Sequence, residues 1–448
     1  MKKYILILIG IIVFIQTARA ETYGNEWINH DLKYYKFKLV NEGLYRISKS
    51  AMLSAGISES EISGSRVRLY RLGKEVPVYV TTENQFENND FIEFYGTEND
   101  GSVDRQLYLV PEFQANIHES LYTDTVSYFL TFDDISDKKR VVEAQNDLSG
   151  TLPKKEDFYY HLSKLYHLGT TFRPGENPNQ LLNYVFDSEY DLGEGFTGLN
   201  IAGPSGVRQH ILPTPNKYIL QPELKAKLKG YVLFSNNSST HRLAISVGNQ
   251  PIDTLYSAKA GIKSIDYDIS MSDYSNGATV RFSALQNNSR DGIYWLAFLY
   301  PRQYNFNNSS KIDFSANKRI ESYVEILNFN NKSTNAIVYD LKNHHRYVAT
   351  RDANITKIYF PETKFIKDSL FITSQDTSDI YTINNLSLAK FVDPIDANYL
   401  IISQKDLLTS PEGVNYVNEF AKYRSSTEGG SFSVATYMID EMENTFSY

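Results

Sequence analysis

The stretch LKYYKFKLVNEGLYRIS, residues 32–48, decides the fold class of the first part of the chain. Apolar and charged side chains alternate through residues 35–40, which is the pattern of a half-buried β-strand. The triplet Asn41-Glu42-Gly43 favours a turn, and residues 44–47 return to the strand pattern. We therefore expect residues 35–40 and 44–47 to form a β-hairpin.

The same region continues with one short helix and further short strands. Ser48 is a good N-cap for a helix over residues 49–55, and Gly56 is a good residue to end it. Strand patterns with polar turns between them favour an all-β sandwich or barrel-like unit. They lie at residues 67–72, 76–82, 91–95 and 126–132. The charged, polar stretch 133–156 is expected to be a linker.

A second β-rich region extends over residues 157–389. Its strand patterns are separated by turns rich in Asn, Ser and Gly, such as 236–239 and 287–289, and predict a jelly-roll or similar two-sheet sandwich. The predicted strands are residues 228–235, 241–247, 264–269, 279–285 and 294–300.

The pattern changes after Phe391. Residues 398–403 form a continuous apolar strand of the kind buried in a parallel sheet, and Pro411 is expected to open a helix. A second strand follows at residues 431–437, and Asp440 starts another helix. This βαβ unit normally opens a larger α/β domain, so we expect the sequence to stop shortly after that domain begins.

The first twenty residues have the features of an export signal. Lys2 and Lys3 precede an apolar run at residues 4–15, and Ala18-Arg19-Ala20 fits a signal peptidase site. An uncleaved N-terminal anchor is the alternative. We expect no other membrane-spanning segment. The expected domains are a signal peptide (1–20), a β-rich domain with one short helix (21–155), a β-sandwich domain (156–392) and the truncated start of an α/β domain (393–448).

Composition excludes several kinds of function. The formal net charge of -8 is mild for 448 residues and argues against a nucleic-acid-binding face, which needs clustered basic residues. The 34 tyrosines favour β-structure. The chain contains no cysteine, which excludes disulfides, thiolate metal ligands and a thiol nucleophile within these residues.

Several blocks of sequence, in matching order along nearly the whole mature chain, resemble PorU-like proteins. These are sortases of the type IX secretion system and relatives of the gingipain cysteine peptidases. The first six blocks resemble the N-terminal part of that family, and the last two resemble the start of its peptidase domain. They are residues 35–38, 42–47, 89–96, 99–102, 121–130, 193–196, 397–402 and 439–448.

The resemblance implies a caspase-like α/β domain with a His–Cys dyad, which family members carry downstream of the segment seen here. It also implies an exported protein of a Bacteroidota-type bacterium, at the outer membrane surface or outside the cell. The implied partners are secreted cargo proteins with C-terminal sorting signals and other type IX secretion components. We carry over no catalytic, cofactor-binding or metal-binding residue, and we expect no cofactor.

Local features with possible chemistry have plainer interpretations. Adjacent histidines at 344 and 345 would point to opposite faces of a strand, so a solvated loop is favoured over a metal site. Residues 98–104 cluster oxygen donors around Gly101 as calcium loops do, but a self-bonded turn is favoured. Nothing in the spacing brings together Asp157, Glu194 and Glu93 as acid–base carboxylates.

Three further motifs have equally plain interpretations. The segment 203–206 is expected to be a turn without the strand–helix context of a phosphate site. The triplet Asp124-Thr125-Val126 resembles an O-glycosylation site of exported Bacteroidota proteins, with a strand-edge Thr125 as the default. No G-x-S-x-G motif is present.

Two functions remain open from the sequence. The chain is either the N-terminal portion of a PorU-like, gingipain-type cysteine peptidase or sortase, inactive by itself because the dyad is missing, or a complete non-catalytic β-sandwich protein. In the second case it would bind cargo, glycan or secretion partners. Whether the chain belongs to an enzyme is therefore uncertain. The β-rich domains could act as a prodomain, a recruiter or a positioning module.

Overall fold

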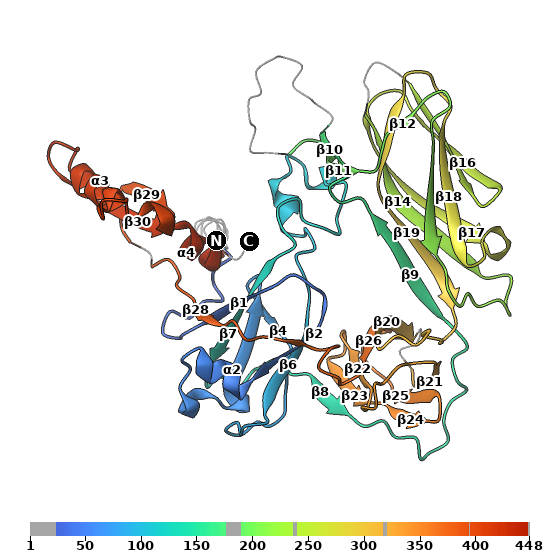
Figure 1. Cartoon of the computed structure of the whole chain (residues 1–448), viewed down its shortest axis with the longest axis horizontal. Coiled ribbons are helices and arrows are strands. Elements are labelled where there is room, and N and C mark those ends of the chain that lie inside the picture. The colour runs from blue at the N-terminus through green and yellow to red at the C-terminus, as the bar shows by residue number, and fades with distance from the viewer. Residues whose placement is uncertain (1–23, 176–189, 236–239, 317–319, 394, 447–448) are drawn as a thin grey trace, which may run out of the picture.

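The computed structural model describes residues 24–175, 190–235, 240–316, 320–393 and 395–446. The predicted signal peptide, the predicted turn at 236–239 and the last two residues lie outside this part of the chain. The protein is mainly β, with separate groups of strands and a C-terminal α/β unit (Figure 1). No helix in the described part is long and apolar enough to cross a membrane.

The first group of strands is a two-sheet sandwich. Its first sheet has the order β28-β1-β7-β3-β4, and its second has the order β27-β2-β6-β5. The first sheet comprises β28 (Ser387–Leu388), β1 (Tyr35–Leu39), β7 (Val126–Phe132), β3 (Val67–Arg71) and β4 (Lys74–Val76). The second comprises β27 (Tyr381–Thr382), β2 (Gly43–Ser48), β6 (Phe91–Gly96) and β5 (Tyr79–Val80).

The predicted hairpin between residues 35–40 and 44–47 is wrong, although both strands exist. β1 pairs with β7 and β28, whereas β2 pairs with β6 and β27. Phe37 of β1 and Ile47 of β2 belong to the same buried core, so the turn carries the chain from one sheet to the facing one. A true hairpin joins β3 to β4 through Leu72 and Gly73, whose φ angles of 47° and 70° suit a tight turn.

Local helix signals in this sandwich are confirmed. The helix α2 covers Lys49–Ser54, and the Ser48 side chain accepts a hydrogen bond from the Ala51 N–H at 3.2 Å. The predicted strand at 76–82 is interrupted at Pro77, which has no N–H for a ladder and separates β4 from β5. Single 3-10 turns occur at Glu59–Glu61, Gly64–Arg66, Asp104–Leu107, Pro111–Phe113, Met271–Asp273 and Lys405–Leu407.

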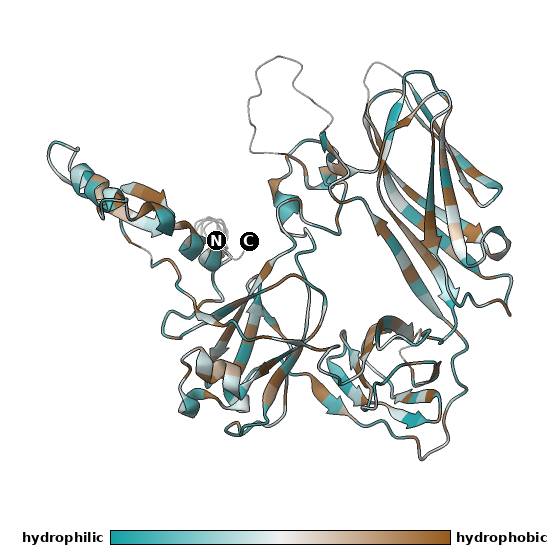
Figure 2. Cartoon of the chain, viewed as in Figure 1, coloured by the Kyte–Doolittle hydropathy of each residue, from teal (hydrophilic) through white to brown (hydrophobic). Residues whose placement is uncertain are grey.

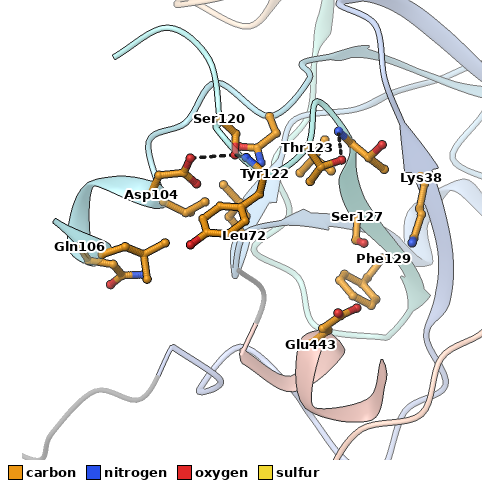
Figure 3. Close-up of a pocket in the computed structure, with 15 residues that line it drawn as sticks. Lys38, Leu72, Asp104, Gln106, Ser120, Tyr122, Thr123, Ser127, Phe129 and Glu443 are labelled. Carbon is orange, nitrogen blue, oxygen red and sulfur yellow. Dashed lines mark hydrogen bonds between the residues drawn. The ribbon is translucent and has the colours of Figure 1, made fainter. Parts of the chain in front are cut away.

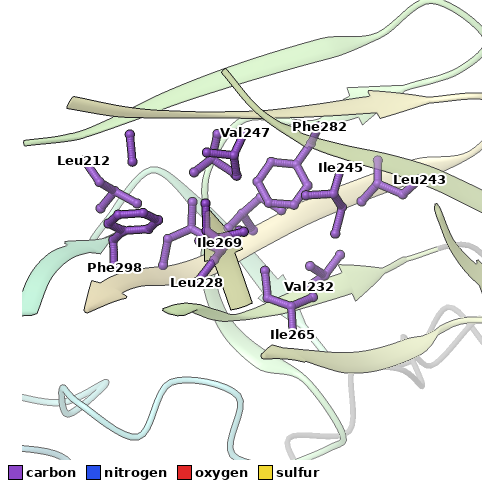
Figure 4. Packing of buried hydrophobic residues seen from close by; sticks show 14 of the residues in the cluster. Leu212, Leu228, Val232, Leu243, Ile245, Val247, Ile265, Ile269, Phe282 and Phe298 are labelled. Carbon is purple, nitrogen blue, oxygen red and sulfur yellow. The ribbon is translucent and has the colours of Figure 1, made fainter. Parts of the chain in front are cut away.

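The second group is the predicted two-sheet sandwich. Figure 4 shows its core, where Leu228 and Phe298 of one sheet meet Ile245 and Phe282 of the other. One sheet comprises β12 (Ile201–Ala202), β19 (Arg290–Arg302), β14 (Lys225–Phe234), β17 (Gly261–Ser270) and β9 (Tyr159–Tyr166). The other comprises β13 (Val207–Pro213), β18 (Gly277–Ala284), β15 (His241–Val247) and β16 (Gln250–Ser257). A two-stranded sheet of β10 (Thr171–Pro174) and β11 (Glu194–Thr197) lies beside it.

A third group of strands has its own core, which includes Val324, Tyr347 and Leu370. Part of the stretch 133–156, expected to be a linker, belongs to it: β8 (Val142–Ala144) pairs in parallel with β23. The group comprises β20 (Lys311–Ala316), β21 (Ser322–Leu327), β22 (Ile337–Asp340), β23 (His345–Val348), β24 (Thr350–Asp352), β25 (Ile355–Phe360) and β26 (Lys367–Thr373). The expected domain limits at 155 and 392 stay predictions, and two strand pairs, β1 with β28 and β8 with β23, join residues on opposite sides of the limit at 155.

The C-terminal unit has the predicted βαβ order. β29 (Tyr399–Ser403) and β30 (Val434–Met438) pair in parallel, with α3 (Tyr416–Ser425) between them and α4 (Ile439–Phe446) after them. α3 does not begin at Pro411, because the chain turns at Gly413 (φ 78°) and Asn415 caps the helix through the Asn418 N–H at 2.9 Å. Leu400 and Ile402 are 53% and 51% exposed on the apolar strand visible in Figure 2.

Candidate functional site

A groove of about 820 Å³ lies where the first sandwich meets the C-terminal unit (Figure 3). Its floor comes from β1, β7 and the end of β3, one wall from the loop 99–125, and the other from α4. Apolar side chains line much of it: Leu72, Val103, Leu107, Tyr122, Val126 and Phe129. A volume of this size and a mixed apolar lining are typical of ligand-binding clefts.

The loop wall is held by a buried carboxylate. Asp104 is only 3% exposed, and it accepts hydrogen bonds from Ser120 Oγ at 2.8 Å and the Leu121 N–H at 2.9 Å. Gln114 Nε2 donates to the Gly101 carbonyl at 2.9 Å. These contacts tie the two halves of the loop together, so the groove has a fixed wall rather than a loose flap.

The oxygen-rich segment 98–104 forms a self-bonded turn within this wall. The Asn99 side chain accepts from the Gly101 N–H at 3.2 Å, and Asp100 accepts from the Ser102 N–H at 3.1 Å. Gly101 has a φ of 71°, which favours glycine. Two of the candidate calcium ligands are therefore engaged with backbone groups, as the turn interpretation expected.

Charged side chains from β1 and α4 meet at the groove. Lys38 and Glu443 line it, and the neighbouring Lys36 Nζ donates to Asn444 Oδ1 at 2.5 Å. Burial and then the nearby Lys38 lower the pKa of Lys36, while Glu443 and Asp440 oppose that shift. The acidic helix thus lies over basic residues of the first sheet, and this attraction favours its docking there.

Residues 387–392, which lead into the C-terminal unit, pack against the first sheet of the first sandwich. The Phe391 ring packs against Trp27, Tyr34 and Phe129 with centroid distances of 5.7, 5.2 and 5.7 Å. Further on, the Val392 N–H donates to Thr445 Oγ1 at 2.8 Å. Because β28 is also added to β1, residues 387–392 and α4 form one continuous contact with the first sandwich.

A second cluster of carboxyl groups lies on the far side of the loop. Burial and then the charge of Glu98 raise the pKa of Glu119 to about 7. Burial and then Glu42 raise the pKa of Glu98 itself. Glu119 also lines a smaller hollow of about 400 Å³ with Tyr122 and Phe196. Sequence spacing gave no sign of this cluster, because its members come from distant parts of the chain.

The three carboxylates considered from sequence lie apart. Glu93 is fully buried and accepts from Arg46 Nε at 2.7 Å, Arg346 Nε at 3.0 Å and the Tyr339 hydroxyl. It therefore joins the first sandwich to the third group of strands. Asp157 pairs with the exposed Lys154 at 3.2 Å, and burial raises the pKa of Glu194 in β11.

The adjacent histidines, Thr125 and the segment 203–206, which were considered from sequence, lie in turns, or at or just before the start of a strand. His344 adopts a φ of 55° in the turn before β23, where its carbonyl accepts from the Val142 N–H at 2.8 Å. His345 begins that strand, with Nδ1 3.3 Å from the Tyr347 hydroxyl. Thr125 lines the groove directly before β7, and its hydroxyl donates to Asp124 at 3.1 Å. The segment 203–206 is a turn between β12 and β13.

A different histidine pair was missed by sequence reasoning. The rings of His167 and His210 lie 5.2 Å apart between their centroids, although the residues are far apart in the chain. Neither residue has a flanking motif that could have indicated the pairing. Only the packing of two edge strands brings them together.

Comparison with known proteins gives an informative structural match. No protein-family model and no curated protein sequence matches the chain. The fold is similar to that of dimeric latent PorU from Porphyromonas gingivalis, with a TM-score of 0.58 and 12% sequence identity. The match covers 93% of this chain and 38% of that protein, so this chain spans well under half of its length.

Weaker structural matches cover smaller parts of the chain. One is the CBM36-1 domain of a multidomain xylanase from the hindgut metagenome of Trinervitermes trinervoides, with a TM-score of 0.20, 12% identity and coverage of 31% of this chain and 95% of the other. That score is too low to support an inference about glycan binding. The comparisons therefore show a PorU-like, β-rich fold over almost the whole chain.

Proposed function

We propose that this chain is the N-terminal portion of a PorU-like, gingipain-type cysteine peptidase or sortase. In this proposal the complete protein removes C-terminal sorting signals from type IX secreted cargo at the outer membrane surface. The observation that carries the proposal is the fold similarity to PorU across 93% of the chain, in a match that covers 38% of PorU. It agrees with the ordered sequence blocks that resemble that family.

The chain's own part in this function is positioning. It has no cysteine, so it supplies no thiol nucleophile. Its β-rich groups instead hold the α/β unit, because β27 and β28 complete both sheets of the first sandwich before the chain enters that unit. Phe391 and α4 then fasten the unit to the same sheet. A caspase-like catalytic domain built on β29 and β30 would take its orientation from this contact.

The groove beside α4 supports the same role. It is formed by the first sandwich and the α/β unit together, with Lys38 from one and Glu443 from the other. A displacement of the α/β unit would therefore change the groove. The alternative, a non-catalytic protein that binds cargo, glycan or secretion partners, would use the groove without any peptidase chemistry.

Two experiments test the proposal. The coding sequence after the Tyr448 codon should continue in frame and encode a His and a Cys, whereas a stop codon there would favour the non-catalytic alternative. In cells, Phe391→Ala should leave C-terminal signals on secreted cargo, as measured by mass spectrometry. Phe365→Ala is the matched control, because that phenylalanine is 45% exposed. Normal processing with Phe391→Ala would contradict the positioning role.

A further inference from the structure

The histidine pair lies at the open edge of the second sandwich, where the edge strands of its two sheets approach each other. His167 directly follows β9 in one sheet, and its backbone N–H donates to the Tyr294 carbonyl at 3.1 Å. His210 lies in β13 of the other sheet, opposite Val280. The two imidazole rings meet at an interplanar angle of 66° with centroids 5.2 Å apart.

Both rings present a nitrogen that no group in the described part of the chain satisfies. Nε2 of His167 and Nε2 of His210 are buried and have no hydrogen-bond partner there. A buried polar atom without a partner is costly, and two of them on neighbouring rings require an explanation. Gly198 packs closely against the His167 ring, because a Cβ atom at that position would lie only 2.8 Å from His167 Nε2.

We propose that His167 and His210 form a two-imidazole site for a transition-metal ion such as Zn²⁺. Imidazole nitrogens are preferred ligands of zinc, copper and nickel, whereas calcium and magnesium prefer oxygen. Two imidazoles that share a tetrahedral ion through bonds of about 2.0–2.1 Å have ring centroids about 5 Å apart. The observed centroid separation of 5.2 Å therefore fits two imidazoles that share one ion.

The protonation state of the pair agrees with this role. Metal ligation requires neutral imidazole, and burial lowers the pKa of both residues, that of His210 to about 4. The neighbouring His167 and Arg208 lower the pKa of His210 further. No group of three His, Cys, Asp or Glu side chains in the described residues could hold a metal, so water would complete the coordination. Both residues are partly exposed, although their Nε2 atoms are buried.

The ion would act as a clamp between the two sheets. β9 and β13 belong to different sheets and share no ladder, so a bound ion would add a direct link across the sandwich edge. Binding to the folded state alone raises the unfolding temperature in proportion to the logarithm of ligand concentration. The site departs from our expectation from sequence, which assigned no metal ligand.

The test is a zinc titration of the mature, tag-free chain by isothermal titration calorimetry. We expect one Zn²⁺ per chain, no response to Ca²⁺, and a higher unfolding temperature with zinc. His167→Gln and His210→Gln should each lower the zinc affinity by about tenfold or more, because each removes one of two protein ligands. His344→Gln is the matched control, since that histidine lies in a turn of another group of strands.

A second measurement needs no variant. Among the eight histidines, the imidazole NMR signals of a close pair should shift on zinc addition, and the others should not. The proposal is overturned if the wild-type chain binds no zinc. It is equally overturned if His167→Gln and His210→Gln are folded and bind zinc like the wild type, or if only His344→Gln loses binding.

Discussion

Replacing Glu93 by Gln tests the buried charge that joins the first sandwich to the third group of strands. The substitution keeps the volume of the side chain and removes its charge. Glu93 has no exposed surface, and its carboxylate accepts from Arg46, Arg346 and Tyr339. Arg346 is 5% exposed, so its guanidinium cannot turn to water when the carboxylate is lost.

The expected cost is large because the buried Arg346 loses its fully buried partner and keeps only its ion pair with the 45% exposed Glu143. Breaking a buried ion pair by removing one partner costs about 3–5 kcal/mol. For a cooperative unit of roughly a hundred residues, this corresponds to a fall of about 12–20 °C in unfolding temperature. Arg46 is 22% exposed and can partly rehydrate, which places the expected loss near the lower end of that range.

The assay is thermal and urea unfolding of the mature chain, with Glu143→Gln as the matched control. Glu143 contacts the same Arg346 at 2.5 Å but is 45% exposed, so its loss should cost less than about 1 kcal/mol. A double-mutant cycle of Glu93→Gln with Arg346→Met should show strong coupling. Equal, small losses for Glu93→Gln and Glu143→Gln would refute the reasoning.

Three further predictions concern the C-terminal unit, the missing thiol and Glu119. The 448-residue product should self-associate more than a chain ending at Val392, because Leu400 and Ile402 are about half exposed next to open strand edges. Light scattering at equal concentration measures this, and equal scattering by the two chains would contradict the prediction. The purified mature chain should show no peptidase activity that iodoacetamide can block, since it has no cysteine; thiol-sensitive turnover by a pure sample would overturn that. The pKa of Glu119 is raised to about 7. The folded state therefore binds more protons than the unfolded state between about pH 4.5 and 7, and the free energy of unfolding falls as pH rises through that window. Glu119→Gln should therefore raise the unfolding temperature at pH 8 and have little effect at pH 4; a gain that is the same at both pH values would argue against the raised pKa.

Local patterns predicted individual strands well and strand partners less well. The alternation through residues 35–40 and the cap at Ser48 both depend on neighbours in sequence, and both elements are present. The partner of β1 depends on β7 and on β28, which lies about 350 residues away. A turn signal such as Asn41-Glu42-Gly43 does not state whether the chain returns in the same sheet or crosses to the facing one.

The same distinction holds for the candidate sites. The adjacent His344 and His345 were visible in sequence and proved to occupy a turn and a strand start. The spatial pair His167 and His210 was invisible, because only the closure of two sheets brings their edge strands together. The groove was likewise not predictable, since its walls come from β1, a loop and α4 at opposite ends of the chain.

The central claim is that this chain belongs to a protein that processes the C-terminal signals of secreted cargo. Its most direct test is mass spectrometry of the C-termini of secreted proteins in a strain that lacks the gene, with and without a restored copy. The account predicts that cargo keeps its C-terminal signal in the deletion strain and loses it again when the complete gene is restored. Cargo that is trimmed normally without the gene would contradict the account.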